Sequence, residues 1–204
     1  RTMIFVTAMV LLFAMVTGAT IAYMTDESNV VTNTFTYGNI TIYLDETDID
    51  GSKKGVIPGV TPDGRDAENV YKILPSTTYI KDPVVRIAQG SEECYTFVKV
   101  ENGFSAYEDV NNTIASQMAA LGWKTVDGKT DVFYYAKTNA TKGDVLKGGD
   151  TVPVFEELAI GSQVTNKNIE AASEAQIIVK AYAVQSQGFD NAGAAWLGAP
   201  LAGW

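Results

Sequence analysis

The chain has 204 residues, of which 46% are hydrophobic and 19% charged, so it is long enough to bury a substantial core. Its 15 basic and 24 acidic residues give a net charge of −9, and no basic patch suited to nucleic-acid phosphates is visible. The chain contains no histidine and one cysteine, Cys94, which excludes histidine-dependent catalytic triads, His-ligated zinc and intramolecular disulfides within it. We therefore expect a domain stabilised by packing, with no cofactor and no nucleic-acid partner.

An uncharged run from Met3 to Met24 follows Arg1 and Thr2. At about 1.5 Å per residue, such a run is long enough to cross a bilayer as a helix. One interpretation is a secretory signal peptide over residues 1–22, cut between Ala22 and Tyr23. The other is a retained segment, residues 1–24, that serves as a membrane anchor or as the core helix of a pilin-like filament. Both predict export, with membrane contact only through residues 3–24.

The first strand is expected over residues 39–44, where Ile40, Ile42 and Leu44 alternate with polar residues. The stretch from Asp45 to Asp66 is rich in Asp, Gly and Lys, which predicts a surface loop or hairpin tip. Short strands are expected over residues 70–74 and 84–88. A stronger strand is expected over residues 94–100, with apolar residues on both faces, as in the centre of a sheet.

One helix is expected over residues 108–121, because apolar residues recur there at helical spacing and Gly122 follows as a C-terminal cap. Asp127-Gly128 predicts a hairpin between residues 123–126 and 132–136. Further strands are expected over residues 155–160 and 176–185, the second of them buried. The uncharged tail from residue 192 is either a docked terminal element or an apolar patch for a partner. Its candidate interface residues are Trp196, Leu201 and Trp204.

Many short strands, one clear helix and no alternation of strands with helices predict a mainly β fold. We expect a jelly-roll-like β-sandwich over residues 39–204, with one or two short helices. The N-terminal apolar helix or signal peptide precedes it, and residues 23–38 connect the two.

Three polar motifs in the sequence are candidate sites. The run Asp45–Asp50 has the carboxylate density of a calcium loop, but the twelfth position is Val56 or Gly59 where an EF-hand needs Glu. A solvated turn is favoured over a bound ion. Glycines and lysines near residues 142–150 lack the spacing of a phosphate-binding loop. The sequences Asn111-Asn112-Thr113 and Asn139-Ala140-Thr141 match the N-glycosylation acceptor pattern, which would mark exposed loops in a glycosylating host.

Several segments, in order along the chain, resemble the TasA and camelysin family. They are Gly18 to Asp26 at the end of the apolar run, the Asn-x-Phe-x-x-Gly pattern of Asn33, Phe35 and Gly38, Lys81-Asp82-Pro83, the strand from Glu93 to Val100, and the C-terminal stretch from Val179 to Trp196. The resemblance implies a secreted protein, cut by a signal peptidase of the SipW type, with a jelly-roll-like fold. It also implies fibres in which the mature N-terminal strand of one subunit adds to the next.

By this resemblance, residues 23–38 are the donor-strand candidate, with Val30, Val31 and Phe35 as anchors. Adding a strand to an open sheet edge satisfies a row of backbone groups, and alternate side chains fill the neighbouring core. Some relatives are peptidases, but this chain lacks histidine and the HExxH motif, so we do not expect that activity.

The resulting prediction is a non-enzymatic subunit of an extracellular filament or biofilm matrix fibre. It would assemble head-to-tail as a homo-polymer at the cell surface, with other matrix or surface proteins as further partners. Two alternatives stay open: the pilin-like filament that keeps residues 1–24, and a monomeric cell-surface adhesion or binding module.

Overall fold

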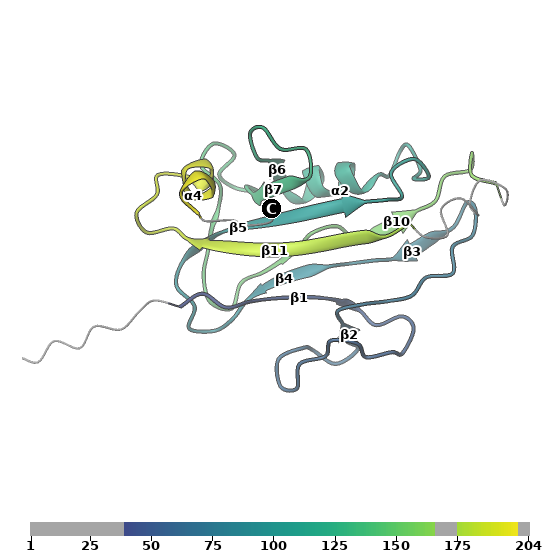
Figure 1. Ribbon diagram of the computed structural model, residues 1–204, viewed down its shortest axis with the longest axis horizontal. Coiled ribbons are helices and arrows are strands. Elements are labelled where there is room, and N and C mark those ends of the chain that lie inside the picture. Colours follow the sequence, from purple (N-terminus) through teal and green to yellow (C-terminus); the bar gives the residue numbers. More distant parts are fainter. Residues whose placement is uncertain (1–38, 166–174, 200–204) are drawn as a thin grey trace, which may run out of the picture. The chain divides into compact units, whose positions relative to one another are not determined.

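The computed structural model describes residues 39–165 and 175–199 (Figure 1). This part of the chain is mainly β, its strand pairs are all antiparallel, and it contains two helices. The donor-strand candidate and the N-terminal apolar segment lie outside the described residues, as do Leu201 and Trp204.

Two sheets account for most strands. The first has the order β2 (Arg65–Asp66), β1 (Ile42–Thr47), β4 (Val84–Ile87) and β9 (Thr151–Pro153). The second has the order β11 (Ile177–Gln185), β5 (Cys94–Asn102), β7 (Val132–Tyr135) and β6 (Trp123–Thr125), with β8 (Val145–Leu146) also paired to β5. A small third sheet joins β3 (Thr78–Ile80) to β10 (Glu157–Ala159).

The main core draws buried side chains from both large sheets, including Val85 of β4, Val98 of β5 and Val152 of β9. Helix α2 (Ile114–Leu121) adds Ile114 and Met118. This distribution follows from the period of two along each strand, which places every second side chain on the inner face. The expected strands near residues 39–44, 84–88, 94–100 and 155–160 are confirmed as β1, β4, β5 and β10.

A second, smaller core lies on the other face of β5. It contains Tyr95 and Phe97, and it is covered by helix α4 (Ala192–Gly198), where Trp196 packs against Phe97 with ring centroids 5.3 Å apart. The expectation that both faces of β5 are covered is therefore confirmed. The uncharged tail contributes a docked helix over its described part, although Leu197 is 86% exposed.

Helix α2 begins later than expected. Thr113 is its N-cap, and the Thr113 side chain accepts the N–H of Ser116. Before the cap, the Glu108 carboxylate accepts the N–H of Ile114 at 3.1 Å, so residues 108–112 are held outside the helix. The expected start of the helix at residue 108 was therefore wrong, and Val110, which lies within the expected range, is outside the helix and 81% exposed. Gly122 is the expected C-cap, with φ of 102°. Neither described helix is long and apolar enough to span a membrane.

The hairpin through Asp127-Gly128 is confirmed, with Trp123 of β6 opposite Tyr135 of β7. Two strand expectations need correction. Residues 70–74 form no strand, because Val70 donates its N–H to the Asp50 carboxylate at 2.8 Å and Leu74 donates its N–H to the Tyr79 hydroxyl at 2.6 Å. Residues 177–185 form the expected strand, β11, but this strand lies at the edge of its sheet. It was expected to be buried, and only Val184 in it is buried.

We expect Phe97→Ala to lower the free energy of unfolding by about 3–5 kcal/mol, because Phe97 is fully buried between β5 and α4. Urea denaturation of the purified domain measures the change. The matched variant Val110→Ala, at a side chain that is 81% exposed, should shift stability by less than about 0.5 kcal/mol. Equal effects of the two substitutions would contradict the described packing of α4.

Candidate functional site

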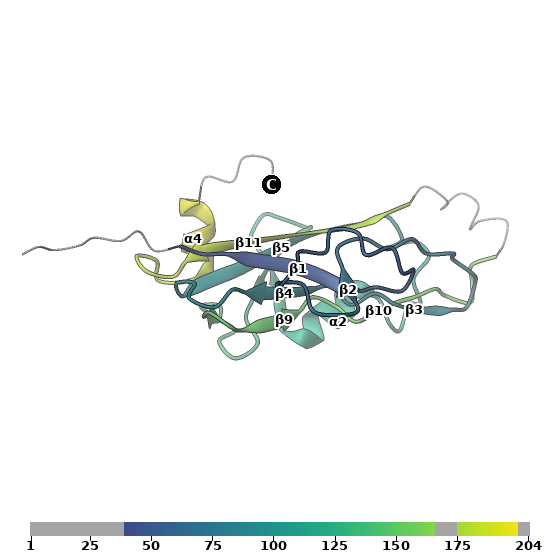
Figure 2. The ribbon, with the colours of Figure 1, turned by 90° about the horizontal axis from the view of Figure 1, so that it is seen from below.

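The feature that stands out is an open margin, which we define as the adjoining free edges of β1 and β11. These two strands are neighbours in space and belong to different sheets (Figure 2). Among the described strands, β11 pairs only with β5 over its nine residues. On its side away from β4, β1 pairs only with β2, at Glu46 and Thr47. The open margin is therefore one strip of surface that is bordered by the free edges of two strands.

The direction of the backbone groups follows from the register. Ser186 donates its N–H to Glu93 at 2.9 Å and Gly103 donates to the carbonyl of Gln176 at 2.9 Å, so even-numbered residues of β11 point their backbone groups at β5. Since this direction alternates along a strand, the backbone groups of the odd-numbered residues 177–185 point into the margin. On β1, the carbonyl of Thr41 accepts the N–H of Ala88, so the backbone groups of Ile42 and Leu44 also face the margin.

Core side chains beside the margin are incompletely covered. The inward-facing residues of β11 and β1 pack against the main core but are only partly buried. They are Ile177, Val179, Ala181 and Ala183 from β11, Ile42 and Leu44 from β1, and Ile40 just before β1. Their cross-strand neighbours on β5, Val98 and Val100, are 0% and 7% exposed. The core is thus closed at β5 and still exposed at the margin.

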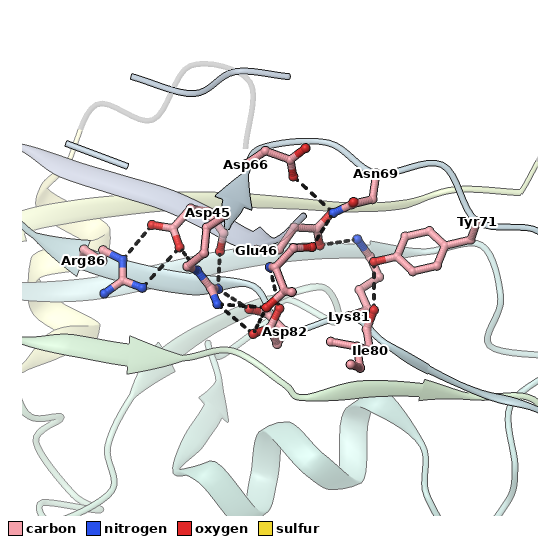
Figure 3. Close-up of polar contacts among 11 residues, drawn as sticks. Asp45, Glu46, Asp66, Asn69, Tyr71, Ile80, Lys81, Asp82 and Arg86 are labelled. Atoms are coloured by element: carbon pink, nitrogen blue, oxygen red, sulfur yellow. Dashed lines mark hydrogen bonds and ion pairs between the residues drawn. The ribbon is translucent and has the colours of Figure 1, made fainter. Parts of the chain in front are cut away.

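One end of the margin deepens into a shallow pocket. Leu44, Ile177 and Val179 form its apolar wall, and Asp45, Glu46 and Lys81 line its polar end. These charged residues belong to a network that ties β1 to β2 and to the segment before β4 (Figure 3).

Asp45 is the centre of that network. Its side chain is 4% exposed and accepts hydrogen bonds from Arg65 Nε and from Arg86 Nε, the latter at 2.7 Å. Arg65 also contacts Asp82, whose carboxylate lies 2.8 Å from Arg65 Nη1. Burial by itself raises the pKa of Asp82, but hydrogen bonds from Thr47 and Arg65 outweigh it and lower that pKa.

Glu46 forms a separate buried pair with Lys81, at 2.7 Å. Asn69 donates to Glu46, to Asp66 and to the Thr47 carbonyl, which joins this pair to strand β2 (Figure 3). Beside them, the Tyr71 hydroxyl donates to the carbonyl of Ile80. Burial, followed by the charges of Glu46 and Asp82, raises the pKa of Tyr71, so this hydroxyl stays protonated and remains a donor.

The acidic run is only partly the solvated turn that the sequence favoured. Asp45, Glu46 and Asp66 are buried, whereas Asp48 and Asp50 lie in the more exposed loop between β1 and β2. The carboxylate oxygens of Asp48, Asp50 and Asp66 lie within 4.8 Å of one another, a set that could hold a hard divalent cation. Burial, with some contribution from the neighbouring carboxylates, raises the pKa of Asp66.

The candidate residues from the sequence are distributed as follows. Trp196 packs on Phe97 within its own domain. Cys94 is fully buried in the core, and burial raises the pKa of its thiol. Ala22, Tyr23, Val30, Val31, Phe35, Leu201 and Trp204 all lie outside the described residues. The margin and the Asp45 network were not foreseen, since both depend on which strands pair and in which register.

No family model, curated protein or solved structure matches this chain. The assignment of function therefore rests on the geometry above and on the motifs in the sequence.

Replacing Asp45 with Asn should lower the free energy of unfolding by about 3 kcal/mol, because Arg65 and Arg86 would lose the carboxylate that they share. Urea denaturation is the measurement. The matched control is Glu68→Gln, which breaks an exposed pair with Lys54 and should leave the unfolding midpoint unchanged. If Asp45→Asn were as stable as the unchanged protein, the network would contribute no net stability.

Proposed function

We propose that this chain is the structural subunit of an extracellular filament or biofilm matrix fibre, in which the open margin of one copy accepts a strand from the next. The observation that carries the proposal is the margin: two neighbouring edge strands whose outward backbone groups have no strand partner among the described residues, with half-covered core side chains between them. An added strand would satisfy both needs at once.

The opposite edges of the two sheets are shorter and offer fewer backbone donors. There the edge strands β6 and β9 have three residues each, and β9 ends in Pro153, which has no N–H to offer. The Trp123 indole donates to the Pro153 carbonyl at 2.8 Å and ties the two sheets together. Proteins commonly shorten or cover edges that must not pair. The contrast supports a specific use for the β1–β11 side.

The donor in this proposal is residues 23–38 of a neighbouring copy, with Val30, Val31 and Phe35 entering the margin. Cleavage between Ala22 and Tyr23 would release this segment on export, as the resemblance to the TasA and camelysin family implies. Each subunit then both gives and receives a strand. Because head-to-tail contacts of this kind do not close on themselves, they generate open filaments.

The same proposal takes the two large sheets as the halves of a jelly-roll-like sandwich that the donor strand completes. Their shared core supports that assignment. No catalytic step is proposed. The role is mechanical and depends on self-association.

Deleting residues 23–35 from the mature form should leave folded monomers that do not polymerise, because the donor is removed while the acceptor margin stays intact. Negative-stain microscopy and sedimentation measure assembly. A synthetic peptide with the sequence of residues 23–38 should bind the truncated protein and raise its melting temperature. Undiminished fibre growth by the truncated protein would reject the proposal.

A second pair of variants probes the acceptor. The N–H of Ala181 points into the margin, so Ala181→Pro removes one donor from the open edge and none from the pairing with β5. We expect slower fibre growth from Ala181→Pro and normal growth from the control Ala181→Ser. Both variants should give the circular dichroism spectrum of the unchanged protein, which checks that they remain folded. Normal assembly of the folded proline variant would exclude this edge as the acceptor.

A further inference from the structure

Three asparagines in the described residues match the N-glycosylation acceptor pattern Asn-x-Ser/Thr. They are Asn39, Asn111 and Asn139, each followed two positions later by a threonine. The sequence pattern is the same at all three positions, but the local structure differs. This difference matters because a glycosyltransferase must reach the asparagine amide and the threonine hydroxyl together.

At two of these positions the acceptor groups are engaged. Asn111 Nδ2 donates to the Asp109 carboxylate at 3.2 Å, and the Thr113 hydroxyl serves as the N-cap of α2. Asn39 Nδ2 lies 3.4 Å from the hydroxyl of Thr41, and the backbone of Thr41 is fixed by Ser91. Modification at either position would disturb an existing contact.

The third position is different. Asn139, Ala140 and Thr141 are all exposed and occupy the turn between β7 and β8. Within the described residues, neither Asn139 Nδ2 nor the Thr141 hydroxyl makes a hydrogen bond. The Asn139 side chain uses only its oxygen, which accepts the N–H of Lys142 at 3.0 Å. That contact leaves the amide nitrogen of Asn139 without a hydrogen-bond partner in the part of the chain that the structure describes.

The turn is also held firmly at its base. The buried Asp144 carboxylate accepts the N–H groups of Thr138 and Asn139, at 2.8 and 2.6 Å. Ala192, at the start of α4, donates its N–H to the carbonyl of Lys142 at 2.7 Å. In addition, Lys124 Nζ donates to the carbonyl of Ala140 at 3.1 Å. The acceptor is therefore presented on a fixed projection of the folded domain.

We propose that Asn139 is an N-glycan attachment site. The donor would be a polyprenyl-linked oligosaccharide. Asn139 Nδ2 attacks the anomeric carbon, a nitrogen–carbon bond forms, and the carbon–oxygen bond to the lipid phosphate breaks. The lipid phosphate or diphosphate leaves with the electron pair, and the amide proton passes to a base of the transferase.

The position of Asn139 is compatible with the proposed filament contact. In the second sheet, β7 and β8 lie on the side of β5 away from β11, so the β7–β8 turn is separated from the free edge of β11 by β5. The inference rests on the proposed function in one respect, namely export, since lipid-linked oligosaccharides are used outside the cytoplasm. It requires no polymerisation.

The test is mass spectrometry of the full mature protein isolated from the organism that carries the gene, with peptides covering all three positions. We expect a glycan on Asn139 at higher occupancy than on Asn111 or Asn39. Asn139→Gln and Thr141→Val should each remove one glycan mass, whereas Thr141→Ser, which preserves the acceptor pattern, should retain it. An unmodified Asn139, or a glycan mass that survives Thr141→Val, would overturn the assignment.

Microscopy of the same preparations separates the two proposals. Filaments built from protein with an unmodified Asn139 would reject only the glycan site. Glycosylated protein that never polymerises would reject only the filament.

Discussion

A backbone amide or carbonyl at the edge of a sheet must find a partner in water or in another chain, and the architecture of this domain concentrates such groups on one side. Strand β11 has nine residues and a partner on one flank only among the described strands. Val179 of β11 and Leu44 of the neighbouring strand β1 pack against the core and yet remain partly exposed. Unpaired backbone and uncovered apolar surface coincide there, and the proposed filament contact follows from that coincidence.

The rest of the domain is closed by different means. Helix α4 covers the outer face of β5, where Trp196 lies on Phe97, and the Trp123 indole joins the two sheets at their far side. At the end of the margin, the Asp45 network anchors β2 to β1 and β4. A rigid surround of this kind would allow the margin to stay open without the domain losing its fold, since the edge strands are held from their other flanks.

Local patterns in the sequence predicted much of the fold. The alternation of Ile40, Ile42 and Leu44 located β1, Gly122 marked the end of α2, and Asp127-Gly128 located the β6–β7 hairpin. The errors came from tertiary context. An apolar run such as β11 has the same appearance at the centre of a sheet as at its edge. Val110 has helical spacing with the apolar residues of α2. However, the Glu108 carboxylate accepts the N–H of Ile114, the first residue of α2, and this contact holds Val110 outside the helix. Similarly, the pairing of Asp45 with Arg65 and Arg86 depends on strand register, which single-sequence patterns do not specify.

Hydrogen exchange at individual amides of β11, compared between monomer and fibre, tests the central claim most directly. The amides of Lys180 and Tyr182 point at β5 and should be protected in both states. The amides of Val179, Ala181 and Ala183 point into the margin, so they should exchange rapidly in the monomer and become protected in the fibre. Fibres in which these three amides still exchange at the monomer rate would contradict the account.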